Sequence, residues 1–230
     1  MNARRWLAHL ALLGLAAPAA AAPLRVVVSI LPQRAFVEAV AGPHARVEVL
    51  VGPGRNMHTY EPTPKQMAAL AEADLVLPIG VPFEHAWLPR LAAANPKLRV
   101  VDLLEAAGVE RLPMIGRAHA GHETHGEGEL DPHVWTDPGL VARLLPPLAA
   151  ALAEADPAHA ADYTAGAERY AGELAALDGE LRSLFAGLAG RRFLVFHPSW
   201  GYLAAAYGLV QVAIEHEGKE PGARALAGLI

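Results

Sequence analysis

The strongest constraint on the fold is a regular alternation of short β-branched runs with longer Ala- and Leu-rich segments. Mostly apolar strands separated by helices are typical of a parallel sheet covered on both faces, because each parallel connection needs a crossover of a dozen or more residues. The predicted strands of this first unit are Val26–Ile30, Val47–Val51, Leu75–Ile79 and Leu98–Val101. The predicted helices between and after them are Gln33–Ala41, Pro64–Ala73 and Phe83–Ala94.

The alternation stops between Glu105 and Leu130, where Gly, His, Glu and Pro dominate and a loop is expected. Two helices are predicted next, over Pro138–Ala155 and, unusually long, from Pro157 to Leu188. A second unit follows them. Its predicted elements are a strand at Arg192–Phe196, a helix at Ser199–Tyr207 and a strand at Leu209–Ile214.

These patterns predict an α/β protein with two parallel-sheet lobes bridged by a long helix. The expected parts are an N-terminal lobe over residues 22–137, helices over 138–190 and a C-terminal lobe over 191–230. After Ile214 only a turn and the beginning of a helix at Pro221–Ile230 remain. Because an apolar helical segment is an odd place for a chain to stop, we expect the second lobe to be truncated.

Residues 1–21 have the order of a secretory signal. Arg4 and Arg5 precede an apolar run from Trp6 to Leu15, and small residues follow up to an expected cleavage point after Ala21. The apolar run is shorter than the ~20 residues that a membrane span needs, which disfavours an uncleaved anchor. We therefore predict export to a Gram-negative periplasm.

Composition excludes several classes of function. The absence of Cys rules out disulfides, thiolate metal sites and Cys nucleophiles. The formal net charge of −5, with no cluster of Lys and Arg, argues against a nucleic-acid partner. Any metal must therefore be held by nitrogen and oxygen atoms.

Three of the eleven His residues lie at junctions between predicted elements. His58 follows the strand that ends at Val51, His197 directly follows Phe196, and His133 lies in a proline-flanked turn. In open α/β sheets ligands bind beyond the carboxyl ends of the strands, and neighbouring prolines stiffen the backbone that holds a ligand atom. Three imidazoles without a thiolate favour Zn(II), with water or a carboxylate as the fourth donor.

A separate group, His119, His122 and His125, lies in the Gly-rich segment 117–130. Its irregular spacing is unsuited to a rigid site, so we interpret it as an auxiliary loop for weak, exchangeable metal capture. The alternative is a solvated, charged loop whose His residues are incidental. Of the remaining His residues, His9 belongs to the predicted signal. Four are interpreted as ordinary surface or helix residues: His44, His85, His159 and His216.

Several motifs in order resemble the substrate-binding proteins of metal-uptake ABC transporters, specifically the zinc-uptake type. These motifs are Met57–Pro64, Ala71–Asp74, Phe83–Leu88, Asp131–Trp135, Phe196–Tyr202 and Glu217–Pro221. The resemblance covers essentially the whole chain after the predicted signal. It implies a metal cleft between two lobes, with His58, His133 and His197 as ligands. Relatives that carry manganese tend to have Glu in place of His197, so the resemblance favours zinc over manganese.

The resulting prediction is a monomeric, high-affinity carrier, not an enzyme, that delivers Zn(II) to an inner-membrane ABC permease with a cytoplasmic ATPase. One alternative is a carrier of manganese or another divalent metal. Another is a zinc hydrolase or lyase built on three His ligands, although the sequence has no His-Glu-x-x-His helix, no Gly-x-Ser-x-Gly turn and no evident general base. An adhesin or zinc chaperone with the same pocket is a third alternative.

Overall fold

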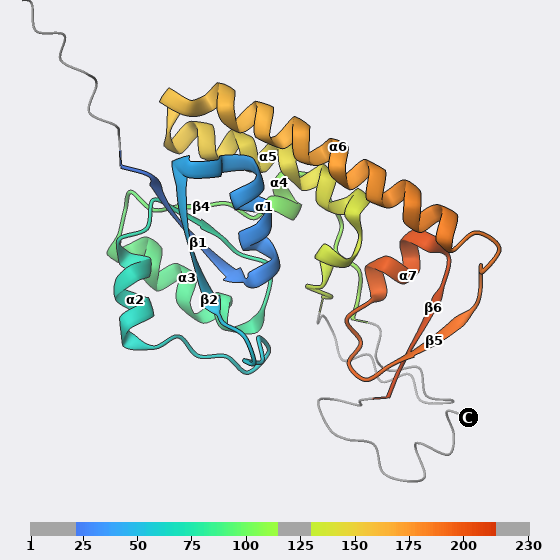
Figure 1. Ribbon diagram of the computed structural model, residues 1–230. Coiled ribbons are helices and arrows are strands. Elements are labelled where there is room, and N and C mark those ends of the chain that lie inside the picture. The colour runs from blue at the N-terminus through green and yellow to red at the C-terminus, as the bar shows by residue number, and fades with distance from the viewer. Residues whose placement is uncertain (1–21, 115–129, 215–230) are drawn as a thin grey trace, which may run out of the picture.

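The structure is a computed structural model in which residues 22–114 and 130–214 are described (Figure 1). Its first part is a sheet of four parallel strands in the order β2-β1-β3-β4, with β1 and β3 in the middle. The strands are β1 (Leu24–Ile30), β2 (Ala45–Val51), β3 (Leu75–Leu77) and β4 (Arg99–Val100). The helices that follow these strands are α1 (Leu31–Ala41), α2 (Pro64–Ala71), α3 (Pro82–Ala94) and α4 (Leu103–Ala106).

The core of the molecule lies in this first sheet. Val26 of β1 pairs with Val47 on one side and Leu75 on the other, and both Val26 and Leu75 are fully buried. The central strands β1 and β3 are apolar and buried on both faces, as expected for a parallel sheet with helices on each side. Helix α1 contacts β1, β2 and two later helices on one side, whereas α2 and α3 lie on the other side (Figure 1).

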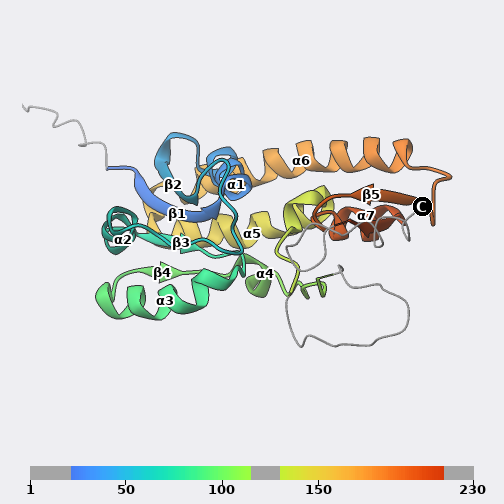
Figure 2. The same cartoon turned by 90° about the horizontal axis from the view of Figure 1, so that it is seen from below.

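Two antiparallel helices connect the first part to the second. Helix α5 (Pro138–Ala155) buries Leu144, Leu148 and Leu152, and it packs along α6 (Ala160–Leu184). In Figure 2 the four strands of the first sheet lie toward one end of α6, and β5 and α7 lie toward the other. Helix α6 therefore bridges the two parts.

The second part is a parallel sheet of two strands, β5 (Arg192–Val195) and β6 (Val210–Ala213), connected by α7 (Gly201–Tyr207). Its strands are far less covered than those of the first sheet. Leu194 is 57% exposed and Val210 is 44% exposed.

The predicted α/β class, the parallel pairing and the long bridging helix are confirmed. The long helix is shorter than predicted at both ends. Residues Pro157–His159 form a 3-10 turn, and after Leu184 the chain turns through Gly187, which has a positive φ of 78°. A left-handed glycine ends a helix at little steric cost, which explains why the helix stops before Leu188.

The start of the predicted loop at Glu105 is also different, because it belongs to the one-turn helix α4. Asp102 caps this helix by accepting hydrogen bonds from the backbone N–H groups of Leu104 and Glu105. Among the described residues, no helix has both the length and the apolar character to cross a membrane. The predicted signal over 1–21, most of the His-rich segment and the predicted helix at Pro221–Ile230 lie outside the described residues, and the predicted lobe boundaries stay a prediction.

Candidate metal centre

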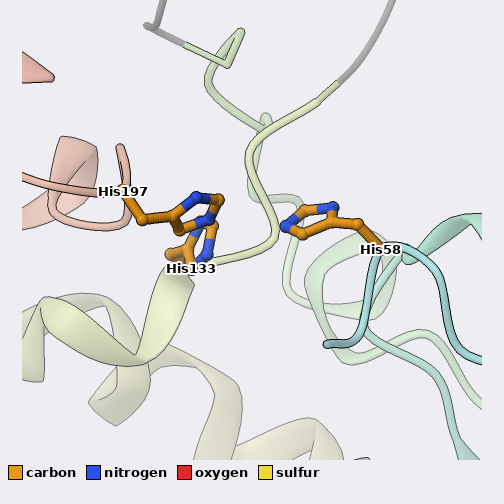
Figure 3. A group of neighbouring side chains, drawn as sticks. All are labelled: His58, His133 and His197. Atoms are coloured by element: carbon orange, nitrogen blue, oxygen red, sulfur yellow. The ribbon is translucent and has the colours of Figure 1, made fainter. Parts of the chain in front are cut away.

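The imidazoles of His58, His133 and His197 come together from three separate segments of the chain, and their rings point toward one another (Figure 3). Each ring offers a nitrogen, and these nitrogens all lie within 4.8 Å of one another. The ring centroids are 5.3–5.9 Å apart. Two nitrogens bound to one tetrahedral zinc ion at 2.0–2.1 Å lie roughly 3.4 Å apart, so small side-chain shifts bring the three rings to ligand distance.

The predicted convergence of these three side chains is therefore observed. Within residues 22–114 and 130–214, they form the one group of three or more His, Cys, Asp or Glu residues close enough to share an ion. Metal binding by the group stays a prediction.

His58 lies on the loop that follows β2, and one side chain ties this loop to the sheet. Gln66 of α2 accepts a hydrogen bond from the Tyr60 hydroxyl (2.7 Å) and donates one to the carbonyl oxygen of Leu50 in β2 (2.8 Å). The backbone N–H of His58 donates to Oδ1 of Asn56 (2.8 Å). His58 is thus held on a loop whose conformation is fixed at several points.

His133 is the most buried of the three, with 2% of its surface exposed. It directly precedes a 3-10 turn that leads into α5. Oδ1 of Asp131 accepts a hydrogen bond from the backbone N–H of His133 (2.8 Å) and lies 2.6 Å from the ring Nδ1. The ring of Trp135 lies 5.1 Å from the His133 ring, centroid to centroid.

His197 comes from the second part of the molecule, two residues after β5 ends at Val195. The backbone N–H of Ser199 donates to the carbonyl oxygen of His197 (2.8 Å) and closes a tight turn. The next residue, Trp200, donates its backbone N–H to Oε1 of Gln211 in β6 (2.7 Å). The position of this third imidazole therefore depends on the two-stranded sheet.

His58 of this group lines a neighbouring cavity of about 230 Å³. One wall of the cavity is His58, and another contains an ion pair between Nη2 of Arg111 and Oδ2 of Asp102 (2.6 Å). His58 and His197 are only partly buried. Two of the three imidazoles therefore keep part of their surface accessible.

A buried carboxylate supports the edge of the first sheet near this cavity. Glu84 accepts hydrogen bonds from the backbone N–H groups of Ile79 (2.9 Å) and Gly80 (2.7 Å), and from the Ser29 hydroxyl. Burial raises the pKa of Glu84, and the hydrogen bonds partly oppose this shift. Glu84 thus holds the turn after β3, in which Gly80 lines the cavity.

Sequence reasoning missed the residues that hold the three imidazoles in place, although the sequence carried signals for two of them. Thr63 and Gln66 have the Thr-x-x-Gln spacing of a capping box. The backbone N–H of Thr63 donates to Oε1 of Gln66, and the backbone N–H of Gln66 donates to the Thr63 hydroxyl oxygen. Asp131 stands two residues before His133, the spacing at which an Asp side chain accepts a hydrogen bond from the backbone.

Two of the His residues interpreted as surface groups are less exposed than expected. His44 and His159 are half-buried, and their rings stack with centroids 3.9 Å apart. The turn after α1 packs against the start of α6 and brings the two rings together. No pattern in the sequence around either His residue indicates this contact. Nδ1 of His159 lies 2.5 Å from Oδ2 of Asp156, and Nε2 of His44 lies 3.4 Å from Oδ2 of Asp162.

His85 is exposed on α3 and lines the cavity, but it is not part of the three-imidazole group. The predicted auxiliary residues His119, His122 and His125 lie outside the described residues, as does His216.

Comparison with known proteins places this arrangement in a family. Residues 26–230 match the family model described as ZnuA, zinc-uptake complex component A, periplasmic. The high-affinity zinc uptake system protein ZnuA of Paracoccus denitrificans (strain Pd 1222) is 34% identical over 225 residues, which cover 86% of this chain and 69% of that protein.

Two further matches agree with this result. The zinc-binding lipoprotein AdcA of Streptococcus pneumoniae serotype 4 is 32% identical over 212 residues; the match covers 90% of this chain and 42% of that protein, so the chain spans less than half of its length. A crystal structure of a ZnuA deletion mutant with zinc bound is 41% identical. It superposes with a TM-score of 0.77 and covers 90% of this chain and 76% of that chain.

Proposed function

Because the chain belongs to the family of zinc-uptake complex component A, we propose that it binds Zn(II) as cargo and delivers it to a metal-uptake ABC transporter. The observation that carries the proposal is the meeting of three imidazoles that come from three separate segments of the fold. Three neutral nitrogen donors with one open position fit a zinc ion that must be both bound and released.

The donor set supports zinc as the cargo. Imidazole nitrogen suits zinc, copper, nickel and iron, whereas manganese and magnesium prefer oxygen ligands. The group contains no carboxylate. Two of the matched relatives are named for zinc, in agreement with this preference.

The proposal includes the surroundings in which such a carrier works. We infer that the chain acts in the periplasm, as a monomer, and that it hands zinc to an inner-membrane permease with a cytoplasmic ATPase. The description of the matched family as periplasmic and the signal-like order of residues 1–21 support this location. The chain is proposed to carry its ligand without transforming it.

Calorimetric titration tests the proposed site directly. Metal-free protein is titrated with Zn(II) and with Mn(II), and the titration is repeated on His58→Ala, His133→Ala and His197→Ala. Each substitution removes one of three donors, so each should weaken zinc binding by about tenfold or more. His85→Ala is the matched control, because His85 lines the same cavity but lies outside the group.

Zinc affinity that is unchanged in all three variants would refute the site. Tighter binding of Mn(II) than of Zn(II) would refute the cargo. Zinc-dependent hydrolysis of an ester or hydration of carbon dioxide by the wild-type protein would instead support the hydrolase or lyase alternative.

A further inference from the structure

The carboxylate of Asp131 lies against the ring of His133. Its Oδ1 lies 2.6 Å from Nδ1 of the ring and 2.8 Å from the backbone nitrogen of the same residue. Asp131 and His133 are almost entirely buried, with 1% and 2% of their surfaces exposed. Little water reaches this pair to compete for the hydrogen bonds.

The geometry fits one assignment of the proton to the two ring nitrogens. Oδ1 accepts a hydrogen bond from the backbone N–H of His133, so it acts as an acceptor toward the ring as well. Nδ1 must then donate, and in the neutral ring the lone pair is left on Nε2. This is the form in which His133 can bind a metal through Nε2 without first exchanging its proton between the two nitrogens.

The other oxygen of Asp131 connects this pair to the second part of the molecule. Oδ2 is buried without a hydrogen-bond partner among the described residues. A Cβ atom added to Gly201, the first residue of α7, would lie only 2.7 Å from Oδ2. The hydroxyl of the next residue, Tyr202, donates to the carbonyl oxygen of Asp131 (3.0 Å). Helix α7 begins four residues after His197. Asp131 therefore contacts both the ring of His133 and the helix that follows His197.

We propose that Asp131 is the positioning residue of the metal centre: it holds the His133 imidazole in the Nδ1–H form with Nε2 directed at the ion, and Gly201 leaves room for its carboxylate. This inference rests on the proposed function. A carboxylate that accepts from the ligating ring also makes the ring a stronger donor, and loss of such a partner typically weakens metal binding by about 10–100-fold.

The first measurement uses the metal-free protein and is independent of zinc. Two-dimensional NMR correlations between the ring nitrogens and ring protons of His133 report which nitrogen is protonated. We expect the Nδ1–H form in the wild type and a mixture of both forms in Asp131→Ala. A wild-type protein in which Nε2 carries the proton overturns the inference.

The second measurement is the dissociation constant for zinc. Asp131→Ala should raise it by about 10–100-fold. Asp131→Asn should raise it less, because the backbone N–H of His133 still selects the amide oxygen as its acceptor and keeps the ring in the Nδ1–H form. Asn therefore partly rescues the site, and this variant retains the shape of the residue if the Ala variant folds poorly.

The chain offers a matched control in Asp156. Its Oδ2 lies 2.5 Å from Nδ1 of His159, the same kind of carboxylate–imidazole contact at a ring outside the metal group. Asp156→Ala and Asp156→Asn should leave the zinc dissociation constant unchanged within about twofold. A loss of affinity as large as that of the Asp131 variants would mean that any lost Asp–His contact disturbs the fold, and would overturn the inference.

Gly201→Ala tests the second contact without removing a charge. The added methyl group should displace the Asp131 carboxylate and weaken zinc binding. Gly172→Ala on α6 should not, because its added methyl group meets open space.

Unchanged zinc affinity in Asp131→Ala would overturn the positioning role. A wild-type protein that binds no zinc but shows the Nδ1–H form would refute the proposed function separately, and would reduce Asp131 to a structural residue.

Discussion

The two sheets of this molecule contribute equally to the candidate metal centre but are packed very differently. In the first sheet Val26, Val28 and Leu75 are fully buried and helices lie on both sides. In the second sheet Leu194 is 57% exposed and Val210 is 44% exposed. His58 follows a strand of the first sheet, whereas His197 follows a strand of the second.

Because of this difference, we expect the first sheet to determine the stability of the fold and the second sheet to complete the three-imidazole group. Apolar burial is the main source of folding free energy, and in the described residues it is concentrated around the first sheet and helices α5 and α6. The second sheet adds little burial but supplies one of three imidazoles. Perturbing the first sheet should therefore change stability, and perturbing the second should change zinc binding at nearly constant stability.

The largest effect expected is on unfolding. Leu75→Ala removes a fully buried side chain from the middle of the first sheet and should lower the free energy of unfolding by about 2–5 kcal/mol. Leu194→Ala, at an exposed position of β5, should change it by about 0.5 kcal/mol or less. Urea unfolding followed by circular dichroism measures both. Equal losses in the two variants would show that the sheets do not differ as proposed.

A smaller effect is expected where α6 crosses α1. A Cβ atom added to Gly166 would lie 2.1 Å from the carbonyl oxygen of Val40, so the two helices must move apart to accept it. Gly166→Ala should cost about 1–3 kcal/mol of stability. Gly179→Ala on the same helix meets open space and should be neutral or stabilising by up to about 1 kcal/mol. Thermal unfolding of the two variants compares them, and a stable Gly166→Ala protein would contradict the close packing.

The smallest effect concerns the contact between α6 and the second part. Asp178 of α6 accepts hydrogen bonds from Nε of Arg182 (2.7 Å) and from the Tyr207 hydroxyl of α7 (3.0 Å). The contact with Arg182, followed by that with Tyr207, lowers the pKa of Asp178 below its ordinary value of 3.8. Burial and the neighbouring Asp178 raise the pKa of Tyr207 to about 12.

The sign of the resulting pH dependence follows from the lowered pKa. A carboxyl group whose pKa is lower in the folded state stabilises the fold above its unfolded pKa, and this contribution is lost as the pH falls below about 4. The stability difference between wild type and Asp178→Asn should therefore be present at pH 6, at about 1 kcal/mol or less, and shrink toward pH 3. A difference that grows on acidification would show that the contact is not ionic.

Much of the fold could be predicted because its signals are local. The strand at Val26–Ile30 is a short apolar run, and the helix at Pro138–Ala155 has an amphipathic period that starts at a proline. Its cap, Asp137, accepts a hydrogen bond from the backbone N–H of Leu140 (3.1 Å). The three His residues could be selected because each lies at the end of an element, where α/β folds place ligands.

The residues that support the site could not be selected in the same way. The contact of Asp131 with Gly201 and Tyr202 joins positions about 70 residues apart. The stacking of His44 on His159 depends on how α1 and α6 pack. Neither contact leaves a pattern in the neighbouring sequence, so hydrophobic periodicity and motif spacing give no information about them.

The sequence by itself determined the α/β class, the order of the strands and helices along the chain, and the chemical type of the candidate donors, because these depend on periodicity and residue identity. Only the tertiary structure decided that the three imidazoles meet, that Asp131 holds one of them and that one sheet is buried while the other is exposed. Distances between remote residues are set by how helices and sheets pack, and packing is a property of the whole chain.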